Sequence, residues 1–83
     1  MTPGKFDVVV GNLVTILTRH LMDARNLSME EAFGRLYGTE FYALLSDADS
    51  RLFLEEDDFL KRCVDIELDS GVDALYAFIR PRV

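Results

Sequence analysis

The sequence predicts an all-α protein, a small bundle of four to five helices with one short extended segment. Two observations predict this fold class. Apolar residues recur at steps of three and four along most of the chain, and residues typical of helix ends interrupt that pattern. The length supports it, because 83 residues with 49% hydrophobic composition suffice for one modest core. We therefore expect residues 1–83 to form a single helical domain.

The predicted N-terminal helix is the longest. Thr2 is suited to the N-cap and Pro3 to the first helical position. Apolar residues and His20 then form one stripe along residues 6–24. The run at 6–10 (Phe-Asp-Val-Val-Val) before Gly11 also fits a strand that ends in a turn. The helix is preferred because the stripe continues past Gly11 without a change of phase.

Two short central helices are predicted next, after the first helix ends at residues 26–27. Ser28 and Glu31 have the spacing of a capping box, in which each side chain bonds the other residue's backbone amide. Gly38 is placed to end this second helix in a left-handed conformation. Thr39 can then cap a third helix that reaches residue 46.

The C-terminal half is predicted to hold an acidic helix and a last short one. A polar turn at 47–51 leads into residues 52–54 (Leu-Phe-Leu), which fit a short extended piece. Glu55, Glu56, Asp57 and Asp58 follow, and they suit the positive end of a helix dipole. Gly71 is placed to end this helix. Residues 72–79 are apolar, and a helix is preferred there over a strand.

The net charge of −6 is unevenly distributed along the chain. Residues 1–38 contain four basic and four acidic side chains, whereas residues 39–79 contain eleven acidic and three basic ones. This balance argues against nucleic-acid binding, because phosphates require Lys and Arg. Apolar runs are too short for a membrane span, and Cys63, as the single cysteine, cannot form an internal disulfide. We expect a cytoplasmic protein that binds neither nucleic acid nor membranes.

No pattern in the sequence predicts catalysis, a metal site or a cofactor. His20 and Cys63 could form a thiol–imidazole pair, but no orienting group is indicated, and packing in or beside the core is the preferred interpretation. Asp47 to Asp58 has the length of a calcium loop, yet Leu52 stands where that loop needs Gly. The paired short helices suggest a helix-turn-helix, but the second offers no cation to DNA.

The central residues also resemble a known family. The features concerned are a Leu-Tyr pair at 36–37, Tyr42, Leu-Leu at 44–45, Asp47 and the run Leu-Phe-Leu-Glu at 52–55, with Ser28-x-x-Glu31-Ala32 before them. Together they resemble a group of short bacterial proteins known only as a domain of unknown function, over about residues 12–68. The chain departs from that family at Ala48 and Arg51, where Pro and Gly are common, and at Glu56-Asp57, where Ser-Pro is common.

This resemblance implies a small helical bacterial protein and assigns no catalytic residue. Genes for such proteins often lie near toxin–antitoxin-like or ADP-ribosyltransferase-like genes. An antitoxin or accessory role is therefore implied by the resemblance.

The preferred functional hypothesis is a non-enzymatic protein-interaction module, antitoxin-like or regulatory, that acts through its acidic C-terminal half. The simpler alternative for that half is a solvated face. A self-associating helical protein without a dedicated partner is the second hypothesis, and a small Cys-dependent enzyme the third. The predicted partner surface combines carboxylates with apolar side chains near the C-terminus: Glu55, Glu56, Asp57, Asp58, Leu75, Tyr76, Phe78 and Ile79.

Overall fold

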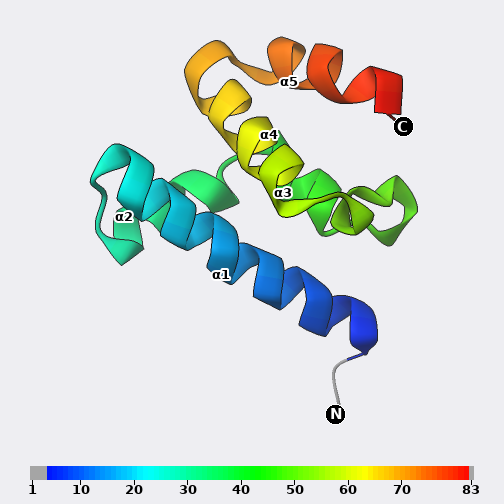
Figure 1. Cartoon of the computed structure of the whole chain (residues 1–83), viewed down its shortest axis with the longest axis horizontal. Coiled ribbons are helices and arrows are strands. Elements are labelled where there is room, and N and C mark those ends of the chain that lie inside the picture. Colours follow the sequence, from blue (N-terminus) through cyan, green and yellow to red (C-terminus); the bar gives the residue numbers. More distant parts are fainter. Residues whose placement is uncertain (1–3, 83) are drawn as a thin grey trace.

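The computed structural model describes residues 4–82, and all regular secondary structure in this part of the chain is helical (Figure 1). Five α-helices follow one another: α1 (Lys5–Arg25), α2 (Met29–Tyr37), α3 (Glu40–Leu45), α4 (Asp57–Ser70) and α5 (Val72–Ile79). Three short 3₁₀ turns complete the chain: η1 (Ala48–Ser50), η2 (Leu52–Leu54) and η3 (Arg80–Arg82). The predicted all-α bundle is confirmed.

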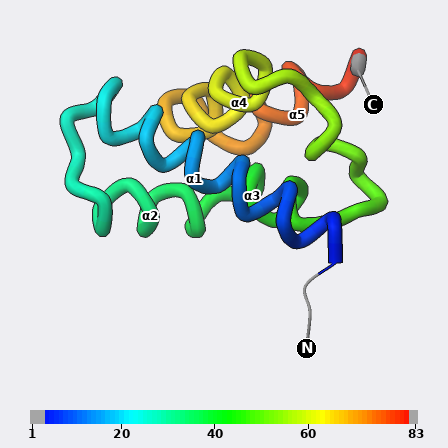
Figure 2. The backbone as a smooth tube through the Cα atoms, turned by 60° about the horizontal axis from the view of Figure 1, so that its bottom comes forward, coloured from blue at the N-terminus to red at the C-terminus, as the bar shows by residue number. Residues whose placement is uncertain are grey.

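The molecule is flat, with extents of 35 × 32 × 19 Å. Figure 2 shows α1 lying between α4 on one side and α2 with α3 on the other, while α5 folds back along α4. The core lies where these elements meet, and its largest fully buried side chains are mostly leucines. Burying each such side chain contributes roughly 2 kcal/mol. The fully buried set includes Leu17, Leu21, Leu36, Phe41, Leu45, Leu52, Leu60 and Leu75.

The first helix confirms the helical interpretation of residues 6–10, which lie within α1. Thr2 and Pro3, the predicted start, lie outside the described residues, and Gly4 occupies the N-cap position of α1. Asn26 ends the helix in the left-handed conformation, with φ 54°. Asn is one of the few residues other than Gly that tolerates this conformation, which explains why α1 stops there.

The second helix begins as predicted and ends differently. Ser28 Oγ accepts from the amide of Glu31 at 3.2 Å, and Glu31 Oε1 accepts from the amide of Ser28 at 3.1 Å. This capping box is confirmed. The prediction that Gly38 is left-handed is wrong, because its φ is −82°. Its amide still donates to Gly34 O at 3.2 Å, so the helical turn is completed before Thr39 opens α3.

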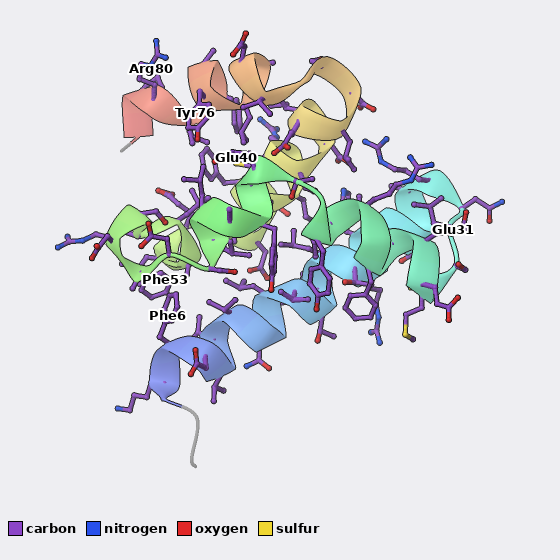
Figure 3. The ribbon with its side chains drawn as sticks, turned by 180° about the vertical axis from the view of Figure 1, so that it is seen from behind. Phe6, Glu31, Glu40, Phe53, Tyr76 and Arg80 are labelled. Carbon is purple, nitrogen blue, oxygen red and sulfur yellow. The ribbon has the colours of Figure 1, made fainter. Side chains whose placement is uncertain are left out.

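The prediction of an extended piece at residues 52–54 is wrong, because these residues form the 3₁₀ turn η2. The amides of Leu54 and Glu55 donate to the carbonyls of Arg51 and Leu52 at 3.1 and 3.0 Å. An isolated extended piece would leave such groups without partners. The turn buries Leu52 and sets Phe53 edge-on against Phe6 of α1, with ring centroids 4.9 Å apart (Figure 3).

The last two helices form as predicted. Gly71 separates α4 from α5 with φ 95°, a value that L side chains rarely adopt. Residues 72–79 are helical, which resolves the choice between helix and strand. Because Gly71 turns the chain sharply, α5 packs along α4 (Figure 1).

Candidate functional site

The four consecutive carboxylates Glu55, Glu56, Asp57 and Asp58, which we call the acidic exit, join η2 to α4. Glu55 is half-buried and the other three are exposed. Asp57 and Asp58 lie in the first turn of α4, where the helix dipole favours negative charge. Within the described residues, no ion pair involves Glu56, Asp57 or Asp58. Their charge is therefore presented to solvent.

Leu54 stands directly before the acidic exit and is 69% exposed, more than any other large apolar side chain described. Its neighbours in the turn point inward, since Leu52 is buried and Phe53 is half-buried. The 3₁₀ geometry thus divides a Leu-Phe-Leu run into two inward side chains and one outward one. Sequence reasoning missed Leu54 because it assigned this run an extended conformation.

Of the four apolar residues in the predicted partner surface, two are buried and two are half-buried. Leu75 and Ile79 are 0% and 4% exposed, so their assignment to a partner surface is wrong. They lie one turn apart on the face of α5 that packs against the rest of the bundle. Tyr76 and Phe78 are half-buried, and Phe78 stacks on Phe59 with ring centroids 5.0 Å apart.

Tyr76 links α5 to α3. Its hydroxyl donates to Glu40 Oε1 at 3.2 Å, and Figure 3 shows the two side chains pointing toward each other. Partial burial and this carboxylate together raise the pKa of Tyr76 above its ordinary value. Beside Tyr76 lies a hollow of about 350 Å³ whose lining is mostly apolar, formed by Leu44, Asp49, Ser50, Leu52, Tyr76, Ile79 and Arg80.

His20 and Cys63 have separate environments. Cys63 is fully buried in the core, as the preferred interpretation expected. His20 lies at the boundary, where its Nε2 is 2.8 Å from Asp65 Oδ2. Asp65 also accepts from Arg25 Nη2 at 3.0 Å, and Arg25 Nη1 donates to Asp69 at 2.9 Å. The hydrogen bonds to the two aspartates raise the pKa of Arg25, and the bond to Asp69 has the larger effect. This network connects α1 to α4.

Glu67 has a structural role that the sequence does not indicate. Its two carboxylate oxygens accept from the backbone amides of Glu40 and Phe41 at 2.7 and 2.8 Å. The hydroxyl of Thr39 accepts from the next amide, that of Tyr42, at 3.0 Å. All three amides of the first turn of α3 are therefore satisfied, two of them by a residue 26 or 27 positions later in the chain. Such a distant cap leaves no local signal.

The near-calcium pattern at residues 47–58 is a capped turn. Asp47 Oδ1 accepts from the amide of Asp49 at 3.0 Å, which begins η1. Among residues 4–82, no three His, Cys, Asp or Glu side chains are grouped so as to hold a metal ion. Over the same residues, no helix combines the length and apolar character needed to cross a membrane.

No protein-family model, curated protein or solved structure matches this chain. The resemblance of its central residues to a bacterial family therefore stays a prediction.

Proposed function

We propose that this protein is a non-enzymatic interaction module that binds a basic protein partner through Leu54 and the acidic exit. One observation supports it most directly. Leu54, the most exposed large apolar side chain described, adjoins three exposed carboxylates that form no ion pair with any residue the structure describes. An apolar side chain at the centre of a contact and charges at its rim are the usual arrangement of a protein interface.

The charge distribution supports a basic partner. Between residues 36 and 60 the chain has one cation, Arg51, against seven carboxylates. Clustered charge of one sign accelerates association with an oppositely charged surface and makes the rate fall as salt is added. An antitoxin-like or regulatory role, as the family resemblance implies, is one form that such a module could take.

The experiment is a binding measurement against the product of an adjacent gene, at two salt concentrations. Leu54→Ser and the triple variant Glu56→Gln, Asp57→Asn, Asp58→Asn should each weaken binding about tenfold or more, because they remove the apolar contact and the charge. The triple variant should also reduce the salt dependence. All these residues are exposed, so the fold should persist.

The matched control is the pair Asp7→Asn and Glu30→Gln. These exposed carboxylates also lie in the first turns of helices, but in the charge-balanced half of the chain. They should leave binding unchanged. Absence of binding by the wild-type protein, or an equal loss in the control, would contradict the proposal.

A further inference from the structure

The outward face of α1 is not covered by any other element of the described chain. Figure 1 shows α1 along one margin of the flat molecule, and in Figure 2 it lies in front, with α4 along one flank and α2 with α3 along the other. Its buried residues lie on one side of the helix, while Asn12, Thr15, Arg19 and Asp23 are exposed and Val8 is 50% exposed. The part of this face around Arg19 lies away from η2, since Arg19 is about 20 Å along the helix from Phe6, which packs on η2.

A groove accompanies this face where α1 meets α2. It has a volume of about 570 Å³ and a mostly apolar lining that includes Met22, Met29 and Phe33. Met29 is 58% exposed at its edge. Flexible methionine side chains and an aromatic ring are typical of surfaces that pack against another protein.

Thr18 gives this groove a second distinguishing feature. The residue is 4% exposed and lines the groove, and its Oγ1 has no hydrogen-bond partner within the described chain. Buried hydroxyls are nearly always hydrogen-bonded, and each exception requires an explanation. A polar group from another molecule in the groove would supply the missing bond.

The charged residues beside the groove would be complementary between two copies of the chain. Arg19 and Asp23 lie one turn apart, both are exposed and both line the groove. Neither makes an ion pair with another described residue. In a two-fold dimer each surface meets an identical copy of itself. If α1 packs antiparallel on a second α1, with the axis between these residues, each Arg19 faces the other copy's Asp23.

We propose that a second copy of this chain docks on the outward face of α1 and the groove beside α2, in a two-fold antiparallel arrangement. The acidic half cannot serve this purpose, because residues 39–79 have eleven acidic against three basic side chains and would repel their own copy. Residues 1–38 are electrically balanced, with four of each. The 21 residues of α1 span about 30 Å, and this is the length along which the two copies would meet.

This dimer uses a surface separate from the acidic exit, so it is independent of the proposed partner binding. Two copies would present two acidic exits, and a partner with two basic sites would bind with higher avidity. Failure of either proposal leaves the other intact.

Reciprocal charge reversal tests the arrangement. In Arg19→Asp, Asp faces Asp across the axis twice, and in Asp23→Arg, Arg faces Arg twice. Each variant should raise the dimer dissociation constant about tenfold or more, as measured by sedimentation velocity over a concentration series. An equimolar mixture should restore dimers, because every facing pair is then opposite in charge. The double variant Arg19→Asp/Asp23→Arg should dimerise like the wild type.

Arg62→Asp is the matched control, because Arg62 is exposed on α4 and its reversal changes the net charge by the same amount. It should leave the dissociation constant unchanged. Circular dichroism checks that every variant remains helical. A wild-type protein that stays monomeric up to roughly millimolar concentration, a mixture that does not recover dimers, or an equal effect of Arg62→Asp would overturn the proposal.

Discussion

Glu67 should contribute more to stability than any other carboxylate of the acidic half. It accepts from the amides of Glu40 and Phe41 at 2.7 and 2.8 Å, and so caps α3 from a neighbouring helix. A helix of six residues has little stability of its own and depends on its caps and its packing. Phe41, the first core residue of α3, is fully buried and is positioned by this contact.

The magnitude follows from the two hydrogen bonds. Loss of a helix cap costs roughly 1 kcal/mol, and leaving a partly buried amide without a partner costs about 1–3 kcal/mol. We expect Glu67→Ala to lower the free energy of unfolding by about 2 kcal/mol. Glu67→Gln should cost about 1 kcal/mol, because its carbonyl still accepts one bond but the charge facing the helix dipole is lost. In a domain of this size, each kcal/mol lowers Tm by about 4–8 °C.

Urea unfolding followed by circular dichroism measures these differences, and amide hydrogen exchange at Glu40 and Phe41 locates them. Glu30→Gln is the control, since Glu30 is exposed in the first turn of α2 and makes no hydrogen bond within the described chain. Its substitution should change stability by a few tenths of a kcal/mol. If Glu67→Ala costs no more than Glu30→Gln, or if exchange at the two amides is unchanged, the capping argument is refuted.

Three other substitutions or measurements follow from contacts of single residues. Asp65→Asn should lower the free energy of unfolding in urea by about 1 kcal/mol, because Asp65 bridges two side chains of α1. Asp69→Asn should cost less, because the Asp69 side chain is 63% exposed and pairs with Arg25 alone among the described residues. Cys63 is fully buried, so a thiol reagent should label it at least about 100-fold more slowly in the native state than in urea; rapid labelling would instead favour a reactive thiolate. The backbone amide of Ser28 donates to the Glu31 carboxylate and lowers the pKa of Glu31 in the folded state. The stabilisation from this hydrogen bond is therefore present above about pH 4.5 and is lost as the pH falls through the lowered pKa. The stability difference between wild type and Glu31→Gln should therefore be larger at about pH 7 than at about pH 3, and an equal difference at both would contradict this.

Features that depend on neighbouring residues could be predicted from the sequence. The capping box joins Ser28 and Glu31, three positions apart, and Thr39 caps an amide three positions on. Gly71 is marked by the conformational freedom that only Gly has. The periodicity of α1 indicated its helical state, because the same stripe runs past Gly11. The caps depend on contacts within about one helical turn, and the stripe of α1 is a regular repeat along a single helix, so both can be recognised from nearby residues.

Features that depend on distant residues could not be predicted. The run at 52–54 is apolar whether it is extended or turned, and contact with Phe6 selects the turn by giving Phe53 a ring to pack against. The apolar character of residues 72–79 did not show which side faces inward, so Leu75 and Ile79 were assigned to the surface. The cap by Glu67 depends on α4 lying beside the start of α3, which follows only from the complete packing.

The acidic half is not one uniform surface, and this decides how its function can be tested. Two groups among its eleven carboxylates have different surroundings. Those in or beside the helix interfaces have cations, amides or a hydroxyl as partners: Glu40, Asp65, Glu67 and Asp69. The exposed members of the acidic exit form no ion pair within residues 4–82, and Asp57 and Asp58 lie in the first turn of α4, where the helix dipole favours negative charge. Neutralising the first group would unfold or loosen the bundle and abolish any binding for that reason alone. Neutralising Glu56, Asp57 and Asp58 removes three negative charges from a segment whose net charge is −8 (eleven acidic minus three basic side chains). It leaves the bundle's contacts in place. A loss of binding in that variant can therefore be attributed to the surface itself.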